Sequence, residues 1–231
     1  REALLSQSND LSDAVRSVLS GHGADGVPLE DPHLALAPLS FVGHPHADGH
    51  LLGVGALLPR DLSRDDRRDV LRALGRVREL KLGRLGVWRL ETVTEARPHW
   101  NLRARAWTAH PDGALEWSTV TPVAFDRHPK EKGKAAYREE VVAMIEQCCT
   151  RIELPRPRQV VVTPVSVHPG VPPAHAFPRL QRKDGSLRRH IHAILVFDKP
   201  VRGPMLLGAG RYCGYGLCRP LDGTGEGGNE P

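Results

Sequence analysis

Three segments of the chain carry apolar residues at helical spacing. A short amphipathic helix is expected at 10–19. A second helix is expected to begin after Ser63, a good N-cap, and to run through Ala73 with Gly75 as its stop. The third is expected at 137–152, where one face carries Val141, Ile145, Cys148 and Ile152. Strand-like segments separate these three helices.

Alternating or continuous apolar runs predict the strands. They lie at 32–43, 50–59, 84–92, 101–109, 114–125, 159–167 and 190–197, and a last element covers 201–221. The order is strand, helix, strand, strand, and the same order then follows again. Two such halves fit a pair of ferredoxin-like (RRM-like) units with antiparallel sheets, so the expected fold class is α+β.

The length of 231 residues fits one large domain or two small ones of about 100 residues each. We expect an N-terminal helix and linker at 1–29, ferredoxin-like units at 30–117 and 118–221, and a disordered tail at 222–231. The start at Arg1 suggests either a trimmed chain or the later part of a longer protein. No run of about 18 apolar residues occurs, so no membrane partner is expected.

The charged residues indicate a class of partner, and the cysteines indicate a cellular compartment. Arg supplies 26 of the 32 cationic side chains, and the net charge is +5. The planar guanidinium suits phosphate and stacks on bases, which favours a nucleic-acid partner, although a GC-rich genome explains the Arg bias equally well. The cysteines lack the Cys-x-x-Cys spacing of structural zinc sites, so we expect reduced thiols and a cytoplasmic protein: Cys148, Cys149, Cys213 and Cys218.

The segment "GHPHADGH" at 43–50 holds three imidazoles and one carboxylate. These groups suit a metal site, acid–base chemistry at neutral pH, or a polar turn between two strands. The segment "GAGRYCGYG" at 208–216 has four glycines that allow close approach of backbone to a phosphate, with Arg and Tyr side chains for charge and stacking. The residues predicted to bind RNA there are Gly208, Gly210, Arg211, Tyr212, Gly214, Tyr215 and Gly216.

A dinucleotide-binding fingerprint is excluded for this glycine-rich segment, because that motif opens a helix and precedes an acidic residue by about 20 positions. The segment "PVRGPMLLGAGRYCGYGLCRPL" instead resembles the C-terminal glycine-rich loop of the CRISPR-associated RAMP superfamily. More narrowly, the chain resembles the Cas-six-like part of the fused Cas-five/Cas-six protein of type I-U (I-G) systems. The segments "SGHGADG", "HADGHLLGV", "WSTVTPVAFDRHPK" and "RRHIHAILVFDKPVRGP" agree with that family.

The resemblance implies an endoribonuclease that binds the CRISPR repeat and cuts the precursor transcript into guide RNAs (crRNA). Cleavage in such enzymes needs no metal or cofactor, because the 2′-hydroxyl of the RNA attacks the adjacent phosphate and leaves a 2′,3′-cyclic phosphate. The implied partners are the repeat RNA and other subunits of a type I-U interference complex. The family proteins are longer, so a Cas-five-like half would be absent here.

A histidine suits the acid or base role in this reaction at neutral pH. In similar enzymes the general acid comes from the first ferredoxin unit, where His22, His33, His44, His46 and His50 lie. Our candidates are His44 and His46, in a loop between strands, and then His33. His190 and His192 share one face of a strand, and we expect that face to contact RNA or to pack.

The basic run "RLQRKDGSLRRH" is expected to form a hairpin tip around an Asp184-Gly185 turn. Such a tip could hold the phosphates of a repeat stem, or it could be a solvated loop. Its cationic side chains are Arg179, Arg182, Lys183, Arg188 and Arg189.

Three other functions have to be weighed from the residues. His44-x-His46 followed by Asp48-Gly49 resembles the opening of the metal-dependent PHP phosphoesterases, but no set of later ligands is evident. A two-histidine phosphoesterase is weaker, because the required hydroxyl residues are missing. The third reading is a subunit that holds crRNA without cutting it.

Overall fold

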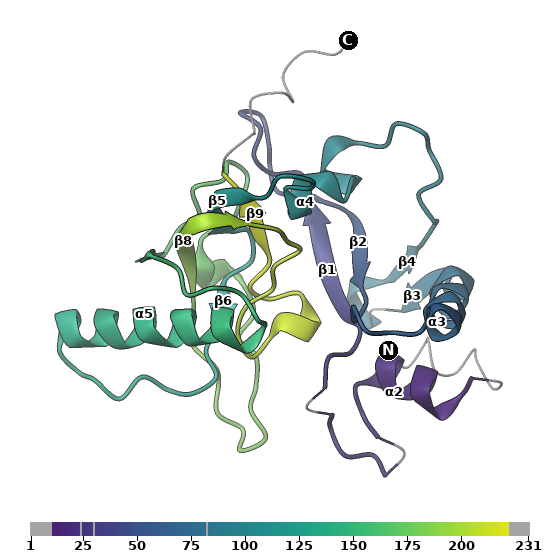
Figure 1. The fold of residues 1–231 in the computed structure, drawn as a ribbon, viewed down its shortest axis with the longest axis horizontal. Coiled ribbons are helices and arrows are strands. Elements are labelled where there is room, and N and C mark those ends of the chain that lie inside the picture. The colour runs from purple at the N-terminus through teal and green to yellow at the C-terminus, as the bar shows by residue number, and fades with distance from the viewer. Residues whose placement is uncertain (1–10, 24, 30, 82, 222–231) are drawn as a thin grey trace. The chain divides into compact units, whose positions relative to one another are not determined.

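The computed structural model describes residues 11–23, 25–29, 31–81 and 83–221 (Figure 1). The tail expected at 222–231 lies outside these residues. The chain divides into two compact units. We call residues 1–35 and 56–98 the helical unit, and residues 36–55 and 99–231 the sheet unit.

The helical unit contains α2 (Asp13–Ser20) and α3 (Arg64–Arg76), which pack against each other. The strands β3 (Glu79–Lys81) and β4 (Val87–Arg89) follow as an antiparallel pair around a 3-10 helix at Gly83–Leu85. The strand expected at 84–92 is therefore confirmed only for its central residues. The buried apolar side chains among the described residues of this unit are Val15, Leu19, Leu34, Ala35, Val70, Ala73 and Val77.

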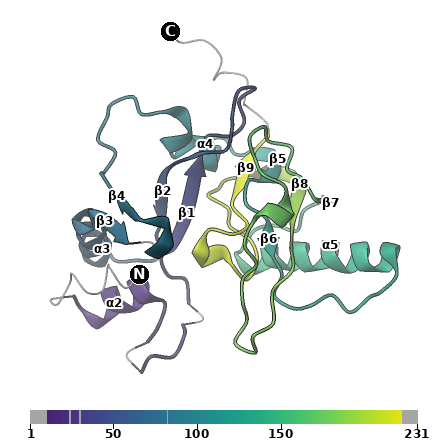
Figure 2. The same cartoon turned by 180° about the vertical axis from the view of Figure 1, so that it is seen from behind.

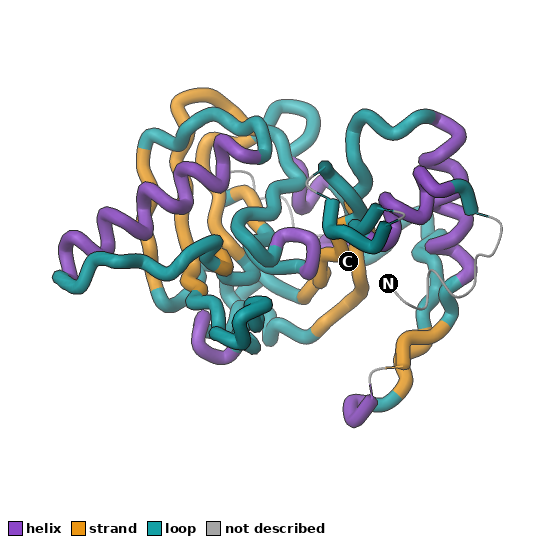
Figure 3. Tube along the Cα trace, turned by 90° about the horizontal axis from the view of Figure 1, so that it is seen from below, coloured by secondary structure: helices purple, strands orange, loops and turns teal. Residues whose placement is uncertain are grey.

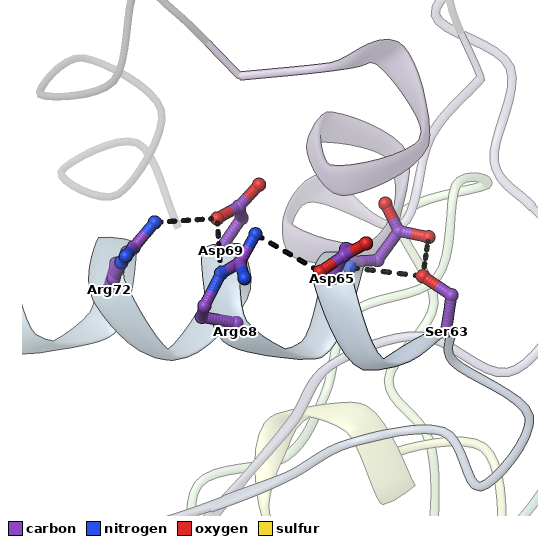
Figure 4. Close-up of polar contacts among 6 residues, drawn as sticks. Ser63, Asp65, Arg68, Asp69 and Arg72 are labelled. Atoms are coloured by element: carbon purple, nitrogen blue, oxygen red, sulfur yellow. Dashed lines mark hydrogen bonds and ion pairs between the residues drawn. The ribbon is translucent and has the colours of Figure 1, made fainter.

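Local polar contacts explain why α3 begins where the sequence predicts (Figure 4). Ser63 Oγ accepts a hydrogen bond from the Asp66 amide at 3.0 Å and donates one to the Asp66 carboxylate at 2.7 Å. Along the exposed side, Arg68 lies 3.1 Å from Asp65, and Arg72 lies 3.3 Å from Asp69. The helix continues through Gly75, the predicted stop, and ends at Arg76.

The sheet unit is built on a five-stranded antiparallel sheet (Figures 1 and 2). β8 is central: β5 and β7 both pair with its residues 194–196 and so lie on its opposite edges. β6 pairs with its first residues, and β9 pairs with β5. The strand bounds are β5 Ala114–Thr119, β6 Val123–Ala124, β7 Gln159–Thr163, β8 His190–Val201 and β9 Cys218–Pro220.

The connectivity of this sheet is that of a ferredoxin-like unit. The chain runs β5, α5, β7, β8 and β9, and the strands lie in the order β7, β8, β5, β9. A split β-α-β arrangement of this kind places the third strand beside the first. The glycine-rich segment joins β8 to β9, where the second helix of such a unit would lie. The predicted α+β class with antiparallel sheets is confirmed, and the unit boundaries at 30–117 and 118–221 stay a prediction.

The helix α5 (Lys134–Arg151) covers one face of the sheet (Figure 3). Its predicted apolar face is buried at Val141, Ile145 and Cys148, and Ile152 packs partly against the same core. The strands contribute Trp117, Leu195 and Phe197 among others to that core. Burial of one continuous apolar cluster is the main stabilising term of the sheet unit.

The strands β1 (Ala35–Ser40) and β2 (Leu51–Leu57) form the predicted hairpin around the histidine loop. The strand expected at 101–109 is wrong, because this segment forms a 3-10 helix at Trp100–Leu102 and the short helix α4 (Arg105–Thr108). The alternating pattern there resembled a strand. Local capping decided otherwise: the His99 ring accepts the Asn101 amide at 3.1 Å and begins the turn.

Substitution of the α3 cap tests the contacts drawn in Figure 4. Ser63→Ala removes the acceptor for the Asp66 amide, so we expect the free energy of unfolding to fall by about 1 kcal/mol. Chemical denaturation with circular dichroism measures the change. Thr94→Ala, also an exposed hydroxyl of the helical unit, is the control and should leave the midpoint unchanged; equal effects would contradict the capping role.

Candidate functional site

The histidine loop lies at the tip of the β1–β2 hairpin and has a defined backbone. Phe41 closes the hairpin, since its amide donates to the His50 carbonyl at 2.8 Å and its carbonyl accepts the Gly49 amide at 3.0 Å. The Ala47 amide donates to the His44 carbonyl at 2.9 Å and forms a turn. The hairpin thus presents its polar side chains from a short, hydrogen-bonded loop.

Three imidazoles lie around the ring of Phe41. Its centroid is 5.8 Å from that of His44, which is stacked, 5.6 Å from that of His50, and 5.3 Å from that of His99, which is edge-on. The ring of His46 lies 5.4 Å from that of His44. We call the four imidazoles and Asp48 the histidine cluster. The structure therefore brings together two predicted catalytic residues, His44 and His46.

His99 was missed by the sequence reasoning, because no spacing signal links it to a loop 50 residues earlier. It reaches the cluster from the turn before α4. Burial, and then electrostatic interactions with His50, Arg103 and His44, lower the pKa of the His99 ring. A ring that resists protonation stays available at neutral pH as a hydrogen-bonding group in its uncharged form.

The cluster also contains a carboxylate–imidazole pair. His50 Nδ1 lies 2.5 Å from Asp48 Oδ1, and the His50 amide donates to the same oxygen at 3.1 Å. The hydrogen bond from the His50 amide, followed by that from its ring, lowers the pKa of Asp48. Both side chains are exposed, so the pair is open to a ligand.

Two buried side chains hold the backbone of the hairpin where the loop begins. Asn101 Nδ2 donates to the carbonyls of Ser40 at 2.7 Å and Val42 at 2.9 Å. Arg219, on β9, donates from Nη1 to the same Val42 carbonyl. A side chain at Gly43 would collide with the Arg219 guanidinium, which explains the glycine there. The loop is therefore fixed by residues far away in the sequence.

The proline-rich segment after β7 supports the other side of the loop. The Gly43 amide donates to the Pro169 carbonyl at 2.9 Å, and a side chain at Gly49 would collide with the Gly170 carbonyl. His190 Nε2 lies 2.7 Å from the Ala174 carbonyl, and His192 Nε2 lies 3.2 Å from that of Pro172. Burial lowers the pKa of both rings, so the face that they share packs against the chain.

His33, the third predicted catalytic residue, lies in the helical unit. Its side chain is buried, and Nδ1 lies 3.1 Å from the Asp31 carbonyl. His33 therefore has a packing environment of its own, while the other two candidates share the exposed loop of the sheet unit.

The glycines of the glycine-rich segment make room for the protein's own atoms. A Cβ at Gly210 would lie 2.6 Å from Leu180 Cδ1, and one at Gly214 would lie 2.7 Å from Pro38 Cδ. Side chains at Gly208 and Gly216 would collide with the carbonyls of Ala124 and Leu207. Close packing alone accounts for these four glycines, and phosphate binding by their backbone stays a prediction.

The side chains of this segment take different roles. The Arg211 guanidinium stacks on the Tyr212 ring, 4.5 Å from its centroid. Tyr215 donates from its hydroxyl to the Pro178 carbonyl, and burial raises its pKa. Arg211 and Tyr212 together offer a cation and a ring, whereas Tyr215 holds the segment that leads to the basic hairpin.

The basic run forms the predicted hairpin tip around Asp184-Gly185. The Arg182 amide donates to the Ser186 carbonyl at 2.8 Å, and the Arg188 amide donates to the Leu180 carbonyl at 2.7 Å. The side chain of Arg188 points inward and donates to the carbonyls of Phe125 and Asp126 at 2.9 and 2.8 Å. The exposed cations of this hairpin are Arg179, Lys183 and Arg189.

Over residues 1–220 the chain matches the family described as "CRISPR-associated protein, GSU0054 family". The chain belongs to this family. The protein therefore has a role in CRISPR defence, as the resemblance in its sequence predicted. No curated protein and no solved structure matches the chain.

Among the described residues of this family member, no three His, Cys, Asp or Glu side chains converge as a set of metal ligands. Burial raises the pKa of Cys148 and Cys149 to about 12, so these thiols are poor ligands and poor nucleophiles at neutral pH. No helix in the described part of the chain has the length and apolar character needed to cross a membrane.

His168 makes the stability of this protein depend on pH. It is 4% exposed, and burial, followed by the charge of Arg219, lowers its pKa to about 4 from 6.5. The unfolded chain binds the proton below pH 6.5, whereas the folded chain does not until about pH 4. The uncharged His168 ring therefore contributes its full share to the free energy of unfolding above pH 6.5. This contribution, about 3 kcal/mol, is lost as the pH falls to 4.

Denaturation at a series of pH values measures this loss. His168→Asn should lower the slope of the unfolding free energy between pH 6.5 and 4, with a remainder from His190 and His192. Above pH 7 the slopes of variant and parent should coincide. An unchanged slope in the acid range would contradict a neutral buried ring.

Substitution of Asn101 tests the support of the histidine loop. Asn101→Ala removes the Asn101 donor from the Ser40 carbonyl, at a cost of about 1–3 kcal/mol, and leaves the Val42 carbonyl with the Arg219 guanidinium alone. We expect a lower melting temperature and faster amide hydrogen exchange at residues 41–50. Asn101→Asp, which keeps the shape but removes the donors, should behave like Asn101→Ala; a fully stable Asp variant would contradict the proposed contacts.

Proposed function

We propose that this protein binds CRISPR repeat RNA and cuts it by attack of the 2′-hydroxyl on the adjacent phosphate, with imidazoles as the acid–base groups. The observation that carries the proposal is the histidine cluster: His44, His50 and His99 lie around Phe41, and His46 lies beside His44. The reaction needs a proton acceptor, a proton donor and donors to the phosphate oxygens within one nucleotide. Several imidazoles a few ångströms apart can supply these groups at neutral pH.

The support behind the loop suits this chemistry. Side chains that move protons must hold their positions while the 2′-oxygen, phosphorus and 5′-oxygen align. Asn101 and Arg219 fix the loop backbone at Val42, and the Pro169 carbonyl fixes Gly43. The catalytic loop is therefore preorganised before RNA binds.

We propose that the basic hairpin and the Arg211–Tyr212 stack hold the RNA. Exposed cations at Arg179, Lys183 and Arg189 can pair with phosphates of a repeat stem without reading its sequence. The Tyr212 ring and the Arg211 guanidinium can stack on an unpaired base. Arg182 lies near the inward-pointing Arg188. After burial, its positive charge is the next cause that lowers the pKa of Arg188.

Cleavage of a synthetic repeat RNA in EDTA tests the proposed reaction. We expect cleavage of the ribose substrate, a 2′,3′-cyclic phosphate end, and no cleavage when the scissile nucleotide carries 2′-deoxyribose. His44→Ala and His46→Ala should lower the rate by at least about 10-fold with little change in affinity. His33→Ala should affect folding first, because this ring is buried.

The other outcomes decide against the proposal. Tight binding without cleavage would leave a subunit that holds crRNA within an interference complex. Cleavage only with added Mn²⁺ or Zn²⁺ would favour a metal-dependent phosphoesterase. Normal cleavage by both the His44→Ala and His46→Ala variants would exclude these two side chains as acid–base groups.

Salt dependence of binding tests the RNA-holding surface. Lys183→Gln combined with Arg189→Gln should weaken binding of the 2′-deoxy repeat, and the slope of log affinity against log salt should fall by about 0.8 for each phosphate that the variant no longer neutralises. Lys199→Gln is the matched control, since Lys199 is exposed about 30 Å along β8 from Arg189. Equal effects of the control and the double variant would contradict a local RNA surface.

A further inference from the structure

The hydrogen bonds of the histidine cluster distinguish its rings by the nitrogen that carries the proton. Asp48 is ionised at neutral pH, since hydrogen bonds from His50 lower its pKa, and a carboxylate only accepts hydrogen bonds. His50 Nδ1, 2.5 Å from Asp48 Oδ1, must therefore carry a proton. The Nε2 atom of His50 is the position that gains and releases a proton.

The rings of His44 and His99 have the opposite arrangement. His44 Nδ1 accepts the His46 amide at 3.2 Å, and His99 Nδ1 accepts the Asn101 amide at 3.1 Å. An amide can only donate, so Nδ1 is unprotonated in each ring and the neutral form carries its proton on Nε2. A second proton on Nδ1 would break the contact with the backbone. In the neutral form, each of these two rings therefore offers its Nε2–H as a hydrogen-bond donor.

We propose that His50 is the imidazole that transfers the proton, that Asp48 is its positioning residue, and that His44 and His99 donate hydrogen bonds to the phosphate. The inference rests on the proposed function. The 2′-oxygen forms a bond to phosphorus and loses its proton to water, while the bond from phosphorus to the 5′-oxygen breaks. His50 Nε2–H gives its proton to that 5′-oxygen and takes another from water.

The hydrogen bonds of each ring decide its role in the proposed reaction. Asp48 holds the ring of His50 in one orientation through the contact between Oδ1 and Nδ1, which leaves Nε2 to act as the acid. The rings of His44, His50 and His99 lie with centroids 5.3–5.8 Å from that of Phe41, and His99 lies near enough to the other two to interact with them electrostatically, so the three rings occupy one small region of the surface. Neutral donors stabilise charge on the phosphate oxygens without competing for the proton.

A repeat RNA with sulfur in place of the scissile 5′-oxygen tests the assignment. A thiolate leaves without protonation, because thiol pKa values lie near 8.5, far below those of alcohols. On the oxygen substrate we expect His50→Ala to lower the cleavage rate by at least about 100-fold, with affinity for the 2′-deoxy repeat within about threefold. On the sulfur substrate the same variant should cut within about threefold of the parent.

The neighbouring variants separate the other roles. His44→Ala and His99→Ala should be slow on both substrates, since the phosphate donors are needed in each case. Asp48→Asn should be slow on the oxygen substrate and recover on the sulfur one. His128→Ala, an exposed imidazole outside the cluster, is the control and should match the parent. A His50→Ala variant that stays slow on the sulfur substrate, or cuts the oxygen substrate normally, would overturn the assignment.

Nitrogen-15 spectra of labelled histidines test the proton positions without any cleavage. In the neutral ring we expect a protonated Nδ1 for His50 and a protonated Nε2 for His44 and His99. Asp48→Asn should change the pattern of His50 alone. If the spectra are as expected but the parent protein does not cut repeat RNA, the proposed function is contradicted and the proton positions stand. If Nδ1 of neutral His50 carries no proton, the inference itself is overturned.

Discussion

The buried guanidinium of Arg219 is the contact on which the candidate site depends. It is 3% exposed, and it donates to the carbonyl of Val42, at the base of the histidine loop. Burial lowers the pKa of Arg219, which shows how much the interior disfavours its charge. A buried charge is tolerated only where polar groups surround it. The loop carbonyl is one such group, so the loop and the last strand hold each other in place.

This contact also explains small residues and uncharged rings nearby. Gly43 leaves space for the guanidinium, and its left-handed backbone, with φ of 78°, turns the chain into the loop. The charge of Arg219 adds to burial in keeping His168 neutral.

Local signals in the sequence were enough to predict most helices and strands. The cap at Ser63, the apolar face of α5 and the alternation of β8 each act within a few residues, and the structure has each element where expected. The segment 101–109 shows where such signals fail. Its alternation suits a strand, but the His99 ring caps a turn and the buried side chain of Asn101 bonds to the hairpin. The first contact is local but does not show in the hydrophobic pattern, and the second depends on chain about 60 residues earlier.

The sequence by itself determined the α+β class, the histidine loop, the basic hairpin and membership of a CRISPR-associated family, because composition, period and motif are properties of short segments. Only the tertiary structure decided which histidines meet. It brought His99 to Phe41, packed His190 and His192 against the proline-rich segment, and filled the space beside the four glycines with the protein's own atoms. The physical reason is that proton positions and burial depend on backbone groups supplied by distant parts of the chain, and no spacing along the sequence encodes those groups.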